Sequence, residues 1–294
     1  MLFGGFRESK PDKGPWVVSL PEDHAVSMYV VLNIIHAKFS FVPRSPSMSF
    51  IYEIRALVDK YDMAQSLTPW YEDWAKVLKA QNIEDGPGLI TATTLAWDFG
   101  DREYFTSLVN RLVLESDIND EGYLRIKDDT CVFESPSPFG PPDLSDTISD
   151  IRSGLVQSIL DSEHNVVERL LGRQKDDSGK HLDCNYNAKQ CNMLMLGSIW
   201  LGMEAIRGSF LPRLADEITE SVEDLVESIE KVNTWMTIAP EHKYCNRSRD
   251  VRDKIKEHLG RCKFELQPSH FELMGKQRGA GEPGEQNGES SKAR

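Results

Sequence analysis

Apolar residues recur every three or four positions along most of the chain, which is the spacing of one face of an α-helix. This pattern predicts helices at residues 26–35, 48–61, 70–78, 89–97, 104–114, 148–170, 192–207, 218–232 and 249–259. The first of them is apolar almost all round, which predicts a helix buried in a core. Residues 16–20 follow a Gly-Pro turn and form the one predicted strand. The pattern therefore predicts a mostly α fold with a small β contribution.

Local composition divides the chain further. Residues 116–145 are rich in acids and turn formers, and their prolines between positions 136 and 142 do not fit a regular element. They are predicted to link a helical extension, 81–115, to a helical C-terminal region, 146–266. Asp143 and Ser145 offer capping oxygens to the long helix after the linker. Because no large apolar residue follows position 274, residues 267–294 are predicted to be a disordered tail.

Charge and cysteine content restrict the class of protein. The 294 residues include 47 acidic and 34 basic side chains, a net charge of -13, which argues against a nucleic-acid partner. The longest apolar stretch, 28–41, is shorter than the ~20 residues that span a bilayer, so no membrane segment is expected. No secretory or transit signal is recognised, which predicts an intracellular protein, nuclear or cytoplasmic. Five cysteines then fit free thiols or a metal site better than disulfides.

Four short motifs occur in order in the first part of the chain. They are Gly5-Phe6-Arg7-Glu8, Leu20-Pro21-Glu22-Asp23, Leu32-x-x-Ile35-His36 and Leu57-Val58-Asp59-Lys60-Tyr61. Together they resemble the second half of the BTB/POZ domain of fungal BTB-domain proteins. The resemblance covers residues 1–80 and continues more weakly over 88–266. It implies the C-terminal half of a BTB/POZ fold, an α+β remnant, followed by a helical C-terminal region.

The resemblance also affects the expected assembly. In this family another half-domain precedes these motifs and carries the main dimerisation surface, so homodimerisation through that surface is in doubt here. Two explanations stay open: a gene prediction that starts late, or a naturally shortened paralogue. Under the first, the chain is a fragment without independent function.

Phe6-Arg7-Glu8 stands where BTB adaptors of cullin ubiquitin ligases carry a hydrophobic-x-Glu triplet that inserts into the cullin. An apolar anchor beside a charged group suits the core and the polar rim of an interface. The resemblance therefore implies a partner-binding site at Phe6, Arg7 and Glu8. The alternative is that Phe6 packs on the following strand and Glu8 is a solvated charge.

Cysteine and histidine residues form a second candidate site. Cys184 and Cys191 precede or begin one predicted helix, and His242 and Cys245 precede another. Zinc takes four such ligands tetrahedrally, usually from two close pairs, which makes these residues candidates for a structural zinc site. The six residues between Cys184 and Cys191 exceed the usual two to four, and buried free cysteines are the alternative.

No catalytic motif of the common hydrolase, nucleotide-binding or metalloprotease kinds is found. The sequence therefore predicts a non-enzymatic protein-protein interaction protein, a BTB-type adaptor or scaffold with protein partners, a cullin among the candidates. No cofactor is predicted apart from the candidate zinc. A zinc-stabilised regulatory domain is the alternative function.

Overall fold

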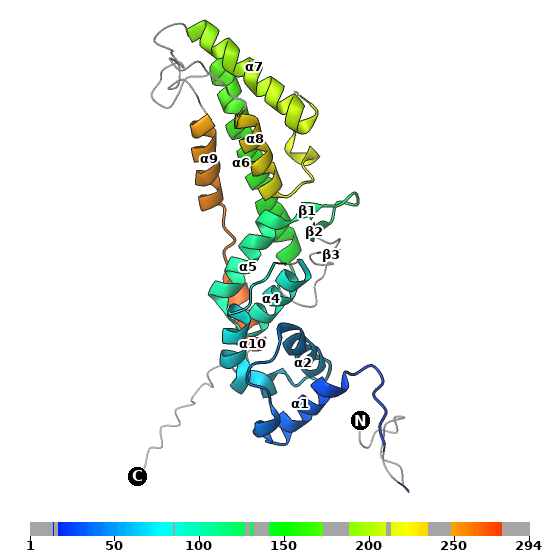
Figure 1. The fold of residues 1–294 in the computed structure, drawn as a ribbon. Helices are drawn as coiled ribbons and strands as arrows, with labels where there is room; N and C mark the ends of the chain where they lie inside the picture. Colours follow the sequence, from blue (N-terminus) through cyan, green and yellow to red (C-terminus); the bar gives the residue numbers. More distant parts are fainter. Residues whose placement is uncertain are drawn as a thin grey trace, which may run out of the picture. The chain divides into compact units, whose positions relative to one another are not determined.

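The computed structural model describes residues 14, 17–84, 86–126, 130–131, 141–172, 188–209, 213–234 and 248–277. In this part of the chain the protein is mostly helical, as predicted (Figure 1). The chain divides into two compact units. The first comprises Met1–Asn82 with Met274–Arg294, and the second comprises Ile83–Leu273.

The first unit is built from helices joined by short turns. In its described residues up to Asn82 it has three α-helices and two 3₁₀ turns, in the order α1 (Ala25–Ile35), the 3₁₀ turn η1 (Phe39–Phe41), α2 (Met48–Lys60), the 3₁₀ turn η2 (Ala64–Trp70) and α3 (Tyr71–Lys79), and its packing centres on α1 and α2. Ser47 caps α2 by accepting a hydrogen bond from the Phe50 amide at 3.3 Å. The buried side chains of α2 and α3, Trp74 among them, form the core on which one face of α1 packs.

Two expectations for this unit were wrong. Residues 17–20, the described part of the expected strand 16–20, have no strand conformation and are exposed. A strand needs a hydrogen-bonded neighbour, and none lies beside them among the described residues. The second error concerns α1, which is not buried on all sides but exposes half of its apolar residues.

The second unit packs its helices around α6. Its elements are α4 (Gly86–Asp98), α5 (Arg102–Glu115), α6 (Leu144–Leu170), α7 (Ala188–Arg207), the 3₁₀ turn η3 (Ala215–Glu217), α8 (Val222–Thr234), α9 (Ser248–Arg261) and the first part of α10 (Pro268–Gln277). The long helix α6 contacts α5, α7, α8 and α9 (Figure 1). It ends before Gly172, which adopts a φ of 72° in the left-handed region that favours glycine.

The predicted linker 116–145 is not featureless where it is described. It contains an antiparallel sheet of β1 (Asp117–Ile118), β2 (Leu124–Ile126) and β3 (Thr130–Cys131). Asn119 turns the chain between the first two strands by accepting hydrogen bonds from the Glu121 and Tyr123 amides at 3.1 and 2.8 Å. Strands of two or three residues are too short to show an alternating pattern. The proline cluster lies outside the described residues.

The predicted tail 267–294 begins with an ordered helix, α10, which corrects the expectation of disorder from residue 267. His270 is buried and stacks on Phe264, with the Trp97 ring against its edge. Its Nδ1 accepts from the Gln267 amide at 3.2 Å, so Nε2 carries the proton and donates to Asp143 at 3.1 Å. Asp143 stands at the N-cap of α6, but no backbone amide of α6 bonds its side chain. The expected cap oxygen therefore holds α10 instead.

No helix in the described part of the chain is long and apolar enough to cross a membrane.

His270 is expected to stabilise α10. His270→Ala removes a buried stacked ring together with its hydrogen bonds to the Gln267 amide and to Asp143, so the free energy of unfolding should fall by roughly 1–3 kcal/mol. Thermal unfolding and amide exchange across residues 268–277 measure the effect. His164→Ala, on the exposed side of α6, is the matched control and should change neither. Equal protection of α10 in both variants would contradict this role.

Candidate interaction surface

The predicted anchor and most of the predicted zinc ligands lie outside the described residues. The predicted site residues that the structure does not describe are Phe6, Arg7, Glu8, Cys184, His242 and Cys245. Cys191 is described, and it is buried in α7 as a free thiol. Among the described residues, no group of three or more His, Cys, Asp or Glu side chains could hold a metal ion. The cullin anchor and the zinc site therefore stay predictions.

Two of the sequence motifs meet in the first unit. Asp23, from the Leu-Pro-Glu-Asp motif, accepts hydrogen bonds from Lys60 at 2.7 Å and from the Tyr61 hydroxyl, both at the end of α2. The Asp23 side chain is only 3% exposed. The Lys60 and Tyr61 hydrogen bonds lower the pKa of the Asp23 carboxyl, and the bond to Asp23 raises the pKa of Tyr61. This cluster fixes the chain just before α1 against the end of α2.

A serine, a histidine and a glutamate meet one turn further on. Ser27 Oγ donates to Glu53 at 3.0 Å, and His24 Nδ1 lies 2.7 Å from the same carboxylate and 2.8 Å from Ser27 Oγ. A catalytic triad needs the serine and the acid on opposite ring nitrogens, with the serine proton facing the ring. Here both face Nδ1, and Ser27 is fully buried. The cluster therefore attaches the start of α1 to α2 and does not activate a nucleophile.

These attachments leave one side of α1 facing outward. Val26, Tyr29, Leu32 and Ile35, three residues apart, are each between 46% and 56% exposed. Each step of three residues turns by about 60° around a helix, so these four side chains together cover the half of α1 that lies opposite its buried apolar residues. In the other direction α1 buries Val30, Val31 and Ile34. The helix thus carries apolar residues on two sides, and only one side is covered.

The exposed side continues onto η1. Phe39 and Phe41 are each 57% exposed. The Phe41 ring packs edge-on against Tyr29 with centroids 6.4 Å apart, and Phe39 packs against Trp70 at 5.3 Å. We call the six residues Val26, Tyr29, Leu32, Ile35, Phe39 and Phe41 the α1–η1 face. A contiguous aromatic and aliphatic surface of this kind is typical of a protein-binding site.

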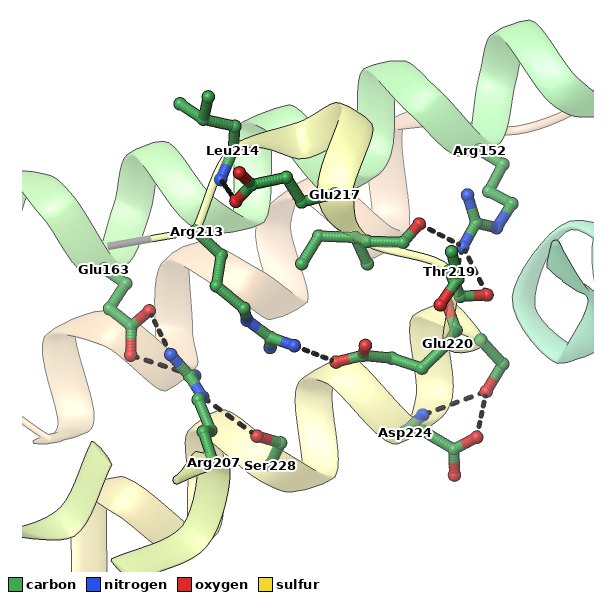
Figure 2. A network of polar contacts seen from close by, with 12 residues as sticks. Arg152, Glu163, Arg207, Arg213, Leu214, Glu217, Thr219, Glu220, Asp224 and Ser228 are labelled. Carbon is green, nitrogen blue, oxygen red and sulfur yellow. Dashed lines mark hydrogen bonds and ion pairs between the residues drawn. The ribbon is translucent and has the colours of Figure 1, made fainter. Parts of the chain in front are cut away.

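A buried arginine organises the second unit. Arg152 lies on the apolar side of α6 and is 1% exposed. Its guanidinium donates to the backbone carbonyls of Ile218, Thr219 and Glu220, the last at 2.6 Å, on the side drawn in Figure 2. It also donates to the carbonyl of Ser116 at 3.3 Å. Burial lowers the pKa of Arg152, while the nearby carboxylates of Asp117 and Glu220 oppose that shift. The arginine therefore joins α6 to the end of α5 and to the segment before α8.

Further ion pairs extend this network towards α7. Arg207, at the end of α7, makes a bidentate pair with Glu163 of α6 at 3.0 and 3.1 Å and donates to Ser228 of α8 at 3.0 Å (Figure 2). Arg213 pairs with Glu220 at 2.7 Å. Each of these carboxylates is committed to an arginine, so the network is a structural tie between helices and lacks a free acid or base.

A shallow groove of about 800 Å³ runs along α5 in the same unit. Its walls come from α5, the end of α9, the segment after it and Phe271 of α10, and they are mainly apolar. Arg102 covers the Phe271 ring at 4.3 Å from its centroid, so this cation is already engaged. Two of the polar side chains in its walls are already engaged, since Ser107 Oγ donates to the Tyr104 carbonyl and Asn110 donates to the Thr106 carbonyl.

Two of these features were missed in the sequence. Arg152 occupies a core position in the apolar series Ile148, Leu155, Ile159 of α6, and a charged residue at such a position is a detectable signal. The exposure of the α1–η1 face has no such signal, because an uncovered apolar residue has the same sequence pattern as a buried one.

No protein-family model, no curated protein and no solved structure matches this chain.

Asp23 should make the first unit more stable at neutral pH than in acid. Its pKa is lowered on folding, so the stabilisation is complete above the unfolded value of about 3.9 and is lost as the pH falls through the folded value. Asp23→Asn should reduce the protection of α2 amides at neutral pH, and the difference from wild type should shrink below about pH 4. Hydrogen exchange at several pH values measures this. If the difference in α2 protection between Asp23→Asn and wild type grew as the pH fell, this stabilising role of the ionised Asp23 would be contradicted.

Removing Arg152 should destabilise the second unit strongly. Arg152→Met keeps the aliphatic stem but leaves buried carbonyls unpaired, at a cost of roughly 2–5 kcal/mol in the free energy of unfolding. Arg125→Met is the matched control, since Arg125 forms a part-exposed pair with Asp117 whose loss should cost about 1 kcal/mol or less. Chemical denaturation of the full chain compares the two. A similar decrease in the free energy of unfolding for both variants would contradict the role given to the buried Arg152.

Proposed function

We propose that this protein is a non-enzymatic interaction protein, an adaptor or scaffold of the BTB type, whose N-terminal unit binds a protein partner. The α1–η1 face is the observation that supports this proposal. Its six large side chains each keep about half of their surface in water. Covering apolar surface contributes roughly 25 cal/mol per Å², so a complementary surface would be bound favourably.

The form of the face suits a macromolecule better than a small ligand. Small-molecule sites are concave and place a few polar groups inside an apolar pocket. The α1–η1 face instead follows the outside of a helix, and α1 carries no charged side chain. Polar groups lie at its margins, with His24 at one end and Lys38 near the other, both exposed. An apolar centre with a polar rim is the usual anatomy of a protein interface.

The resemblance to BTB adaptors of cullin ubiquitin ligases suggests a cullin as the partner. In this proposal Phe6-Arg7-Glu8 supplies the anchor that inserts into the cullin, and the α1–η1 face provides additional apolar contact. The function consists of bringing two proteins together, and no bond is made or broken by this chain. The sites therefore contribute through surface complementarity and not through chemistry.

Two substitutions test the proposal in calorimetric titrations against a purified cullin. Phe6→Ala should weaken binding by about 1–3 kcal/mol, as expected for an interface anchor. Tyr29→Glu should weaken it by at least as much, because a charge would be buried without a partner. Tyr29 is half exposed, so Tyr29→Glu should leave the helical content unchanged, which circular dichroism can check.

Tyr123→Glu is the matched control. Tyr123 is a large exposed side chain in the turn between β1 and β2 of the second unit, and its replacement should leave binding unaltered. The adaptor proposal fails if wild type does not bind the cullin. It also fails if both Phe6→Ala and Tyr29→Glu bind as tightly as wild type.

A further inference from the structure

Helix α7 has one face in the core of the second unit and an opposite face in solvent. Cys191, Met195, Ile199 and Met203 are buried, at spacings of four residues. Helix α7 packs on α6 and α8 (Figure 1), which accounts for the burial of one side of it. This packing accounts for the position of α7, but it does not account for the composition of the opposite face.

The outer face carries an apolar series of its own. Leu194, Gly197 and Leu201 follow one another at spacings of three and four, with Met193 and Trp200 beside them. The four large side chains are between 48% and 65% exposed. We call these five residues the α7 stripe. Alternating spacings of three and four give the narrow seam along which two helices pack side by side.

Gly197 stands at the middle of the stripe. A Cβ atom added there would meet no atom within 4 Å, so the space over this glycine is open. The absence of a side chain at the centre lets the backbone of a second helix approach closely. Leu194 and Leu201 would then lie on the two sides of the crossing point, three and four residues away.

The two ends of the stripe carry opposite charges. Lys189 is exposed at the start of α7, eight residues before Gly197, and Glu204 is exposed seven residues after it. In a parallel pair of α7 helices Lys189 would face its own copy, and so would Glu204. In an antiparallel pair crossing at Gly197, each Lys189 would face the Glu204 of the other copy. The charge pattern is therefore complementary to itself in only the antiparallel direction.

We propose that a second copy of this chain binds the α7 stripe, and that the two α7 helices pack antiparallel about a two-fold axis at Gly197. Each Leu194 then contacts the partner's Trp200 and each Met193 contacts the partner's Leu201. This is the reciprocal arrangement that a two-fold interface requires. The assembly uses a surface of the second unit and does not rest on the proposed function of the first.

The length of the helix sets the expected affinity. A helix of 20 residues is about 30 Å long, and a single helix-on-helix contact lies at the small end of specific interfaces. The dimer should therefore dissociate in the micromolar range and exchange between copies. Sedimentation over about 1–100 µM of the full-length chain, at physiological salt, spans that equilibrium.

Leu201→Glu tests the apolar contact. Wild type should change from monomer to dimer over this range, and Leu201→Glu should stay monomeric, with a dissociation constant raised more than about tenfold. Tyr123→Glu is the control, because Tyr123 is also a large exposed side chain but does not belong to α7, and this variant should dimerise as wild type does. The proposal is overturned if wild type is monomeric throughout, as it would be if another part of the chain covered the stripe. It is equally overturned if Leu201→Glu dimerises normally.

Charge reversal tests the direction of the helices with variants that alter only exposed positions. Lys189→Glu and Glu204→Lys should each weaken the dimer about three- to tenfold, because each creates two like-charge contacts. The double variant should restore the wild-type dissociation constant. In a parallel pair the single variants would have no such effect and the double variant would offer no rescue. That result would overturn the antiparallel arrangement.

Discussion

The packing of the second unit depends on one buried arginine, Arg152. Its guanidinium replaces the water that the carbonyl groups of Ser116 and residues 218–220 would otherwise bind, and it does so from the N-terminal third of α6. An arginine suits this position because its planar group offers several donors in fixed directions. Its desolvation is offset by these hydrogen bonds and by the charges of Asp117 and Glu220. One side chain thereby fixes where α5 ends and where α8 begins.

Other elements take their place from this constraint. The Ile118 amide donates to Thr219 at 2.8 Å, which aligns the small sheet with the segment that Arg152 holds. Helix α8 starts directly after that segment, with Ser221 accepting from the Asp224 amide at its first turn. Helix α7 then packs on α8, and Arg207 ties its end to Glu163 and Ser228. The direction in which α7 presents its outer stripe is thus a consequence of contacts made on its inner side.

Hydrophobic spacing was sufficient to locate the helices, and it failed where another interaction decides the structure. The helix at 148–170 was predictable because its apolar side is long and regular. Helix α10 was missed because His270 and its partners Asp143 and Trp97 are far apart in the sequence. The expected strand at 16–20 has suitable residues, but a strand is defined by a neighbour, which no local pattern supplies. The exposure of one side of α1 could not be predicted for the same reason, because burial depends on which other element packs against a helix.

The zinc ligands and the cullin anchor could be named from residue type alone, whereas their geometry could not.

The two exposed apolar faces differ in whether charged residues of the same helix could fix the orientation of a partner. The α1–η1 face has large aromatic residues but no charge within α1, so apolar contact could supply affinity there without fixing the orientation of a partner. Orientation would have to come from charged groups outside the helix, which is the role that Arg7 and Glu8 would have beside Phe6. The α7 stripe places a positive and a negative side chain at opposite ends of its own helix, and so carries an orientation within itself. A surface of the first kind is suited to a different protein that provides the complementary charges. A surface of the second kind is suited to its own copy, because the complement of its charge pattern is the same helix reversed.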